Sequence, residues 1–248
     1  MNRPILKIAS FNMQAGIGSH RPRHFITYGW RYLFPHKASH ENLDTISDAL
    51  APFDIVALQE ADAGSYRSNF IHQQEYLARQ AGFHHTRSLI TREFSPMACI
   101  SMGMLSRHPI AYTCEHRLPA SRHGRGALEI SISWQGRDIA IITTHLSLQQ
   151  HSRMRQLRYL ASLVNRHRSA IIMGDFNCAP DSREMSLLLN HTRLHFSNTP
   201  SPCTFPSWQP RRRLDHILAT GDLEISNLET LPLLCSDHLP ITAEISLR

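Results

Sequence analysis

The sequence has few cysteines and no long apolar run, and each absence excludes a class of protein. No stretch reaches about 18 consecutive apolar residues, so we expect no transmembrane helix. The five cysteines are odd in number and none forms a C-x-x-C pair, which argues against a disulfide framework and against a structural zinc site. Free cysteines are typical of a reducing compartment, and we therefore expect a cytoplasmic protein.

Internal repeats, low-complexity tracts and linkers rich in Gly, Ser or Pro are also absent. The chain of 248 residues therefore predicts a single domain over residues 1–248. A G-x-S-x-G motif is lacking, and Cys178 has no evident histidine partner, which argues against serine and cysteine hydrolases.

The charge balance is positive, at +6 with histidine neutral. A basic protein favours anionic partners such as nucleic acid, phospholipid headgroups or phosphorylated metabolites. Charge does not choose among these partners, so peripheral contact with a membrane surface stays open. We expect a monomer.

Apolar runs predict more strands than helices. Strands are expected at residues 5–11, 54–59, 99–105, 109–113, 127–134, 139–144, 169–173, 214–219, 223–229 and 241–247. Helices are expected at residues 40–50, with Ser39 as N-cap, and at 69–81, 150–167 and 182–190. Residues 135–138 (QGRD) predict an antiparallel hairpin, which excludes a purely parallel sheet. An α/β protein with two packed sheets flanked by helices fits this pattern.

Polar residues of catalytic types follow or begin six of these strands. They are Asn12, Glu60, His145, Asp175 with Asn177, Asp215 with His216, and Asp237 with His238. Any one of them alone is explained by a turn or a solvated strand end, but six such ends together are hard to attribute to chance. Rigid strands position the loop residues of α/β enzymes, so this pattern predicts an active site at one sheet edge. In IIMGDFNC (171–178), side-chain alternation predicts that Asp175 and Asn177 point the same way.

In order along the chain, these residues resemble the endonuclease/exonuclease/phosphatase superfamily, which includes deoxyribonuclease I, abasic-site endonucleases, neutral sphingomyelinases and inositol polyphosphate 5-phosphatases. The resemblance is carried by SFNMQ (10–14), LQE (58–60), LSRHPI (105–110), RGALEI (125–130), TTHLS (143–147), GDFNCAPDS (174–182), TFPSW (204–208), RRRLDHIL (211–218) and SDHLPI (236–241). It runs from about residue 5 to residue 247 and is strongest toward the small bacterial members. It implies a four-layer α/β/β/α sandwich (DNase I-like) with the site at one edge of the two sheets.

The resemblance also implies a Mg²⁺-dependent (or Mn²⁺-dependent) hydrolase of phosphoester or phosphodiester bonds. Hard oxygen ligands suit Mg²⁺, and Glu60 is the best metal ligand, with Asn12 and Asp237 as its neighbours. His238 is the expected general acid/base, with Asp215 as the carboxylate that fixes its tautomer.

Three further residues complete the implied machinery. Asp175 and Asn177 match the pair that orients the attacking water and the phosphate. His145 matches a second histidine of the deoxyribonuclease and sphingomyelinase branches, where it would contact a phosphate oxygen or assist the leaving group. His216 is expected to point away from the site as a bystander.

Substrate contacts are predicted from cationic and aromatic residues, with a structural role as the alternative for each. The candidates are Arg107, Arg125, Arg212 and Trp30. Trp30 belongs to a long segment, residues 16–38, that mixes cations with aromatics and is expected to lie at the mouth of the site.

Two departures and one alternative accompany these predictions. Ser101-Met102-Gly103 lacks an asparagine common in the superfamily at that point, and the inositol phosphatase pattern is not matched. The alternative function is a non-catalytic phosphate-binding module on a degenerate enzyme fold. The retention of all eight expected site residues argues against it.

Overall fold

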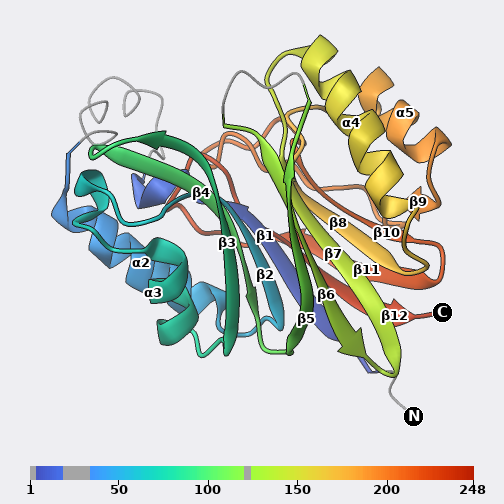
Figure 1. Cartoon of the computed structure of the whole chain (residues 1–248), viewed down its shortest axis with the longest axis horizontal. Coiled ribbons are helices and arrows are strands. Elements are labelled where there is room, and N and C mark those ends of the chain that lie inside the picture. Colours follow the sequence, from blue (N-terminus) through green and yellow to red (C-terminus); the bar gives the residue numbers. More distant parts are fainter. Residues whose placement is uncertain (1–3, 19–33, 120–123) are drawn as a thin grey trace.

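Two six-stranded sheets pack face to face in the computed structural model, which describes residues 4–18, 34–119 and 124–248 (Figure 1). The first sheet has the order β11 (Leu223–Thr230), β12 (Ile241–Leu247), β1 (Leu6–Asn12), β2 (Ile55–Asp62), β4 (Ala98–Ser106) and β3 (His85–Phe94). The second has the order β5 (Ile110–Arg117), β6 (Gly126–Trp134), β7 (Arg137–His145), β8 (Ala170–Asp175), β10 (Asp215–Thr220) and β9 (Leu194–His195).

Helices cover the outer face of each sheet and make the fold four layers deep. Helices α2 (Lys37–Leu50) and α3 (Gln73–Gln80) flank the first sheet, and α4 (Gln150–Val164) and α5 (Arg183–Asn190) flank the second (Figure 1). Short 3-10 turns lie at Gln14–Gly16 and Tyr66–Ser68. The predicted α/β/β/α sandwich is therefore confirmed. None of the helices in the described ranges is both long and apolar enough to cross a membrane.

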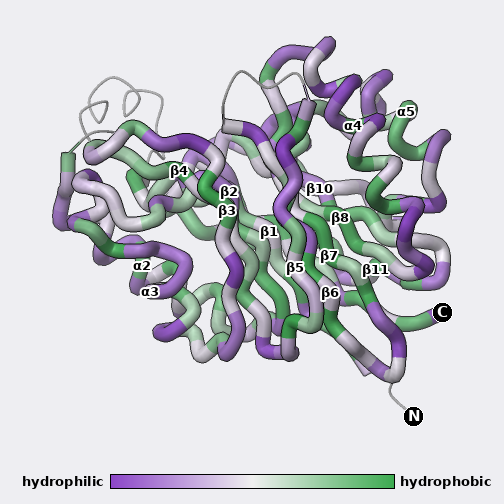
Figure 2. Tube along the Cα trace, viewed as in Figure 1, coloured by the Kyte–Doolittle hydropathy of each residue, from purple (hydrophilic) through white to green (hydrophobic). Residues whose placement is uncertain are grey.

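Apolar side chains from both sheets fill the central layer, and two further cores lie beneath the helices. Figure 2 shows hydrophobic stretches along the central strands and hydrophilic stretches along much of the helices. Strands such as Ala170–Asp175 are buried along their whole length because both of their faces are covered.

Several element boundaries differ from the predictions. Strand β3 was not predicted, because its sequence (HTRSLITREF) is largely polar and it lies half-exposed at a sheet edge. Helix α2 begins at Lys37, and its N-cap is His36, whose side chain accepts from the backbone N–H of Ser39. Helix α3 begins at Gln73 rather than residue 69, and α4 ends at Val164 rather than residue 167.

Strand direction brings the predicted polar residues to one edge. Strands β1 and β2 run parallel to each other, as do β7 and β8. The register places His145 beside Asp175, and Asp175 beside Asp215 on the antiparallel strand β10. The two sheets are also joined near this edge, because buried Gln59 donates from Nε2 to Ser10 Oγ at 3.1 Å and to Thr143 Oγ1 of the other sheet at 3.0 Å.

A buried carboxylate organises the turn that follows β2. Asp62 accepts hydrogen bonds from the backbone N–H and the hydroxyl of Ser65, from the hydroxyl of Ser68, and from Arg67 Nε at 2.6 Å. Burial alone would raise the pKa of Asp62, but these hydrogen bonds and the Arg67 charge outweigh it and lower the pKa. The ionised form therefore stabilises the folded chain.

We expect Asp62→Ala to lower the free energy of unfolding by about 3–5 kcal/mol, because Arg67 would be left buried without its partner. Urea denaturation at neutral pH measures this loss, and exposed Asp138→Ala serves as the control. Since the folded-state pKa is lowered, the contribution is present above the unfolded-state pKa and fades as the pH falls through the folded-state pKa. A loss that was equally large in strong acid would contradict this explanation.

Candidate active site

The end of strand β8 is shaped by Gly174. Its φ of +146° is one that side-chain-bearing residues rarely adopt, and an added Cβ would lie 2.0 Å from the backbone oxygen of Thr144 on β7. This close approach fixes the backbone one residue before Asp175. Phe176 then turns to the other side of the sheet and is fully buried in the core beneath α4 and α5.

We expect Gly174→Ala to destabilise the fold by about 3 kcal/mol or more, because the methyl group would collide with backbone rather than with a movable side chain. Urea unfolding gives the magnitude. Gly221→Ala is the matched control, since no atom lies within 4 Å of its added Cβ. Equal stability of the two variants would show that β7 and β8 can separate at little cost.

Asp175 lies at the centre of the site and is 1% exposed. Its Oδ2 accepts from Asn12 Nδ2 at 3.1 Å and lies 3.3 Å from His145 Nε2 and 3.8 Å from His238 Nε2. Its Oδ1 accepts from the backbone N–H of Asn177 at 2.9 Å. Burial raises the pKa of Asp175 to about 6, against the opposing charge of His238. A carboxylate thus stands between two imidazoles.

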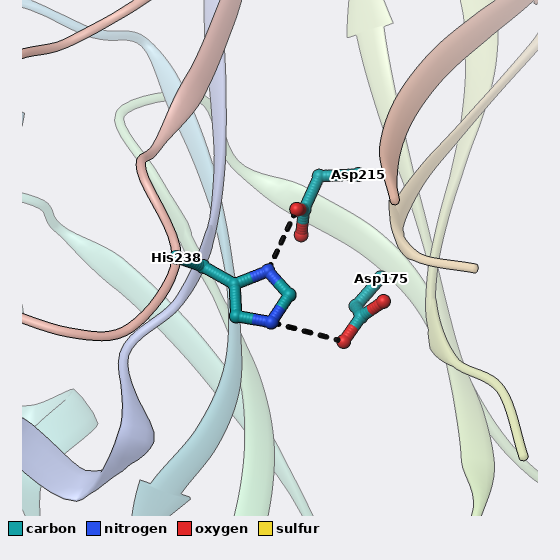
Figure 3. Close-up of side chains that lie close together, drawn as sticks. All are labelled: Asp175, Asp215 and His238. Carbon is teal, nitrogen blue, oxygen red and sulfur yellow. Dashed lines mark hydrogen bonds and ion pairs between the residues drawn. The ribbon is translucent and has the colours of Figure 1, made fainter. Parts of the chain in front are cut away.

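His238 is held by a second carboxylate from the other sheet. Its Nδ1 donates to Asp215 Oδ2 at 2.8 Å, so that Nε2 faces Asp175 (Figure 3). The same Asp215 oxygen accepts from the hydroxyl of Thr204 at 2.5 Å, and the Phe205 ring lies 4.9 Å from the His238 ring, centroid to centroid. Burial opposes protonation, but Asp215 and Asp175 prevail and raise the pKa of His238 to about 10. His238 is therefore an imidazolium at neutral pH.

His145 has the opposite electrostatic character. Its Nδ1 lies 3.8 Å from Glu60 Oε1, and its Nε2 faces Asp175. Burial, with the charges of Arg125 and His238, lowers the pKa of His145 well below its usual value. The site thus contains one neutral and one charged histidine, both beside the same carboxylate.

Glu60 and Asp237 supply oxygen donors that fit a hard divalent cation. Glu60 sits in a bulge of β2 with a φ of +54°, which leaves its side chain 36% exposed at the strand end. Although part of this side chain is exposed, desolvation of the carboxyl group by the surrounding protein raises the pKa of Glu60; the charge of Arg125 opposes this shift and the charge of Asp175 adds to it. Burial likewise raises the pKa of Asp237 to about 6, and the charge of Glu60 adds to this shift. The charge of Glu60 thus disfavours ionisation of Asp237, and a cation bound by both carboxylates would relieve this repulsion. Asn12 lies beside Asp175 at the same sheet edge.

A second group of donor atoms competes for the role of metal site. Among the described residues, Asp175, Asp215 and His238 bring ligand atoms within 4.8 Å of one another. However, the Asp215 oxygen and the imidazole Nδ1 of this group are already hydrogen-bonded to each other. A cation could bind both of these atoms only if that hydrogen bond were broken.

Asn177 reaches the site by a different route from the one predicted. Strand β8 ends at Asp175, so strand alternation does not apply beyond it. Asn177 has a φ of +52°, and its side-chain amide donates to the carbonyl of Leu146. The structure thus shows its backbone orienting Asp175, while a contact between its side chain and phosphate stays a prediction.

The predicted substrate-binding residues have different outcomes. For Arg107 the predicted substrate contact is wrong and the structural alternative is confirmed. Arg107 follows β4 at the end that pairs with the start of β2, away from Glu60. It donates hydrogen bonds to the backbone carbonyls of Ala51, Phe53, Ala81 and Gly82. Its guanidinium ties loops together. Arg125 lines a pocket with Glu60 and His145, and its contact with substrate stays a prediction. Arg212 is exposed and packs on Phe205, which contacts His238. Trp30 and most of residues 16–38 lie outside the described residues.

His216 points away from the site, as expected. It is fully buried, donates from Nε2 to the carbonyl of Cys178 at 2.8 Å, and packs between Phe176 and Phe196.

Other residues at the site were missed by the sequence analysis. Thr204 and Phe205 come from a loop without periodicity, and the Ser236 hydroxyl donates to the Asn12 carbonyl at 2.6 Å. Only their place inside the quoted TFPSW and SDHLPI segments marked them.

The comparisons with known proteins agree with this geometry. Residues 9–238 match the profile of the Endonuclease/Exonuclease/phosphatase family. No curated protein matches the sequence. Among solved structures, an endonuclease/exonuclease/phosphatase from Beutenbergia cavernae DSM 12333 is 19% identical in sequence, with a TM-score of 0.78. The match covers 99% of this chain and 72% of the Beutenbergia chain.

Two more structures resemble the chain over nearly all of both lengths. A mannosyl-6-phosphatase from Bacteroides thetaiotaomicron VPI-5482 is 14% identical with a TM-score of 0.71, covering 98% of this chain and 100% of its own. A humanized TDP2 of D. rerio is 15% identical with a TM-score of 0.71, covering 98% and 99%. At these identities the likeness shows the fold alone.

Proposed function

Because the chain belongs to the Endonuclease/Exonuclease/phosphatase family, whose members are hydrolases that act on phosphoester bonds, we propose that it is a Mg²⁺-dependent phosphodiesterase. The observation that carries the proposal is the position of Asp175 between His145 and His238, with the Glu60–Asp237 carboxylate pair beside them. Hydrolysis of a phosphodiester needs a proton acceptor, a proton donor and charge neutralisation, and this arrangement offers all three.

The cation would be held by Glu60 and Asp237, with Asn12 as their neighbour. When bound, Mg²⁺ would neutralise the charge of the phosphate oxygens and of the leaving oxygen. Mn²⁺ would serve the same oxygen donors.

The protein's own groups divide the proton transfers between them. Asp175, with a pKa of about 6, accepts a proton from the attacking water near neutral pH. His238 serves as general acid and electrostatic partner, because Asp215 fixes its Nδ1 and leaves the protonated Nε2 facing the reacting group. This proposal refines the roles expected for Asp175 and His238: Asp175 acts as the general base and His238 as the general acid.

His145 and Arg125 complete the surroundings of the phosphate. His145, kept neutral, contacts a phosphate oxygen or supports the leaving group without adding charge. Arg125 lies close enough to Glu60 and Asp175 to perturb the ionisation of both groups. Its charge would therefore attract an anionic substrate to the reaction centre.

A substrate panel with Mg²⁺ tests the proposal: plasmid DNA, single-stranded RNA, sphingomyelin, phosphoinositides and a chromogenic phosphodiester. Cleavage of one or more by the wild-type protein, lost in Asp175→Asn, is the expected result. Binding of phosphate compounds without turnover of any of them would instead favour the non-catalytic module. Preference for sphingomyelin or phosphoinositide vesicles would support peripheral contact with a membrane.

A further inference from the structure

A pocket of about 620 Å³ opens beside the reaction centre. Glu60 and His145 line one side, and the other sides come from β3, from the start of β6 and from the beginning of α4. Glu60 is the sole carboxylate among the described residues that line it, and Glu60 is assigned to the cation. The rest of the pocket therefore has positive and neutral walls.

Two arginines of this lining have donors to spare. Within the described parts of the chain, the guanidinium groups of Arg92 and Arg125 make no hydrogen bond and no ion pair within 4 Å. The Arg92 guanidinium carbon lies over the Phe94 ring, 4.2 Å from its centroid, a contact that orients the group without using its N–H donors. The two like charges oppose each other, since Arg92 adds to the effect of burial in lowering the pKa of Arg125.

The facing wall adds further donors. Gln149, His151 and Ser152 line the pocket at the start of α4. Gln149 is the N-cap residue but makes no side-chain cap, and the first turn of the helix carries no acidic residue. The Glu184 carboxylate accepts hydrogen bonds from the side chains of Gln150 and Arg153 near this helix start. With no acidic residue of its own, the first turn still favours an anion at its N-terminus.

We propose that this pocket is a subsite for a second phosphate group of the substrate, bound by Arg92 and Arg125 opposite the start of α4. The inference rests on the proposed phosphodiesterase function and specifies its substrate class. The substrate carries an anionic group next to the ester that is cleaved, as a nucleotide chain does and a phosphocholine ester does not. Two arginines that line one pocket suit a phosphate, whose oxygens accept several charge-assisted hydrogen bonds at once.

Binding measurements separate the subsite from catalysis. Thymidine 3′,5′-bisphosphate and thymidine 5′-phosphate would be titrated calorimetrically, with Mg²⁺ present, into the wild-type protein, Arg92→Glu and Arg79→Glu. Arg79 is exposed on α3 and gives the same change in net charge. We expect Arg92→Glu to weaken bisphosphate binding by about tenfold or more while changing monophosphate binding by less than about twofold. Arg79→Glu should change neither.

Kinetics with matched esters then link the subsite to turnover. The p-nitrophenyl esters at the 5′-phosphate of the same two compounds differ only in the 3′-phosphate. Arg92→Glu should raise KM for the bisphosphate ester by about tenfold and leave kcat for that ester little changed. Both kcat and KM for the singly charged ester should also change little. The subsite would be overturned if Arg92→Glu weakened the binding of both ligands equally or raised KM equally for both esters. It would also be overturned if Arg79→Glu had the same effects as Arg92→Glu. Absence of turnover in the wild-type protein would overturn the proposed function instead, and the calorimetry would still decide on the subsite.

Discussion

Substitution of His238 by alanine should lower kcat by about 10²–10⁴-fold, the usual cost of removing a positioned acid or base. The reason is geometric. Asp215 accepts a hydrogen bond from His238 Nδ1 at 2.8 Å, so that Nε2 faces Asp175, where the reacting phosphate would bind. The decline should appear in kcat rather than in KM, because the imidazolium is needed most when charge develops on the phosphate. Steady-state kinetics on a chromogenic phosphodiester measures it.

His216→Gln is the matched control for this result. His216 is also buried and also follows a site aspartate, but it binds the Cys178 carbonyl on the helix side of the sheet. Its substitution should lower the melting temperature, because a buried hydrogen bond is lost, yet the kcat of the folded fraction should stay within about threefold of the wild-type value. Comparable loss of kcat in both variants at equal folded fraction would mean that the wrong histidine has been assigned.

Removal of the cation is the second large effect that we expect. Excess EDTA should abolish turnover, and Mg²⁺ or Mn²⁺ should restore it. Glu60→Gln should lower kcat/KM by about 100-fold or more, since a metal contributes several kcal/mol to neutralising charge in the transition state. Undiminished turnover in EDTA would rule out the metal mechanism.

Thermal unfolding gives a readout of the same site that does not depend on turnover. Added Mg²⁺ should raise the Tm of the wild-type protein, because a ligand that binds only the folded state stabilises it. The rise should be absent in Glu60→Gln and retained in the control Glu75→Gln, which changes an exposed glutamate on α3. Without Mg²⁺, Glu60→Gln should be at least as stable as the wild-type protein, because burial disfavours the ionised carboxylate.

The central strands and the site residues at their ends were predictable because both signals are local. A buried strand such as residues 170–175 is a continuous apolar run, and a polar residue at its end is conspicuous. Strand β3 had neither property, because an edge strand with half-exposed residues needs no apolar alternation. Its neighbours in space, rather than its own sequence, determine its conformation.

The roles of the arginines could not be predicted from the sequence, because a motif does not reveal which end of a sheet its side chain will face. Arg107 and Arg125 both stand in segments shared with the superfamily, yet one ties backbone carbonyls together and the other lines the pocket. Arg92 lay in a stretch with no predicted structure at all. The role proposed for Arg92 follows only once β3 places it in the lining of the pocket that Arg125 also lines.

The division of the site between the two sheets has a consequence for how activity is acquired. Glu60 and Asn12 lie on strands of the first sheet and His238 lies in the loop that leads into its strand β12, while Asp215, Asp175 and His145 lie on strands of the second. The contacts His238–Asp215, Asn12–Asp175 and Gln59–Thr143 all cross between them. A refolding intermediate with only one sheet assembled would leave His238 without Asp215 and Asn12 without Asp175. The return of hydrolysis during refolding should therefore coincide with docking of the sheets, and lag behind any spectroscopic signal of strand formation.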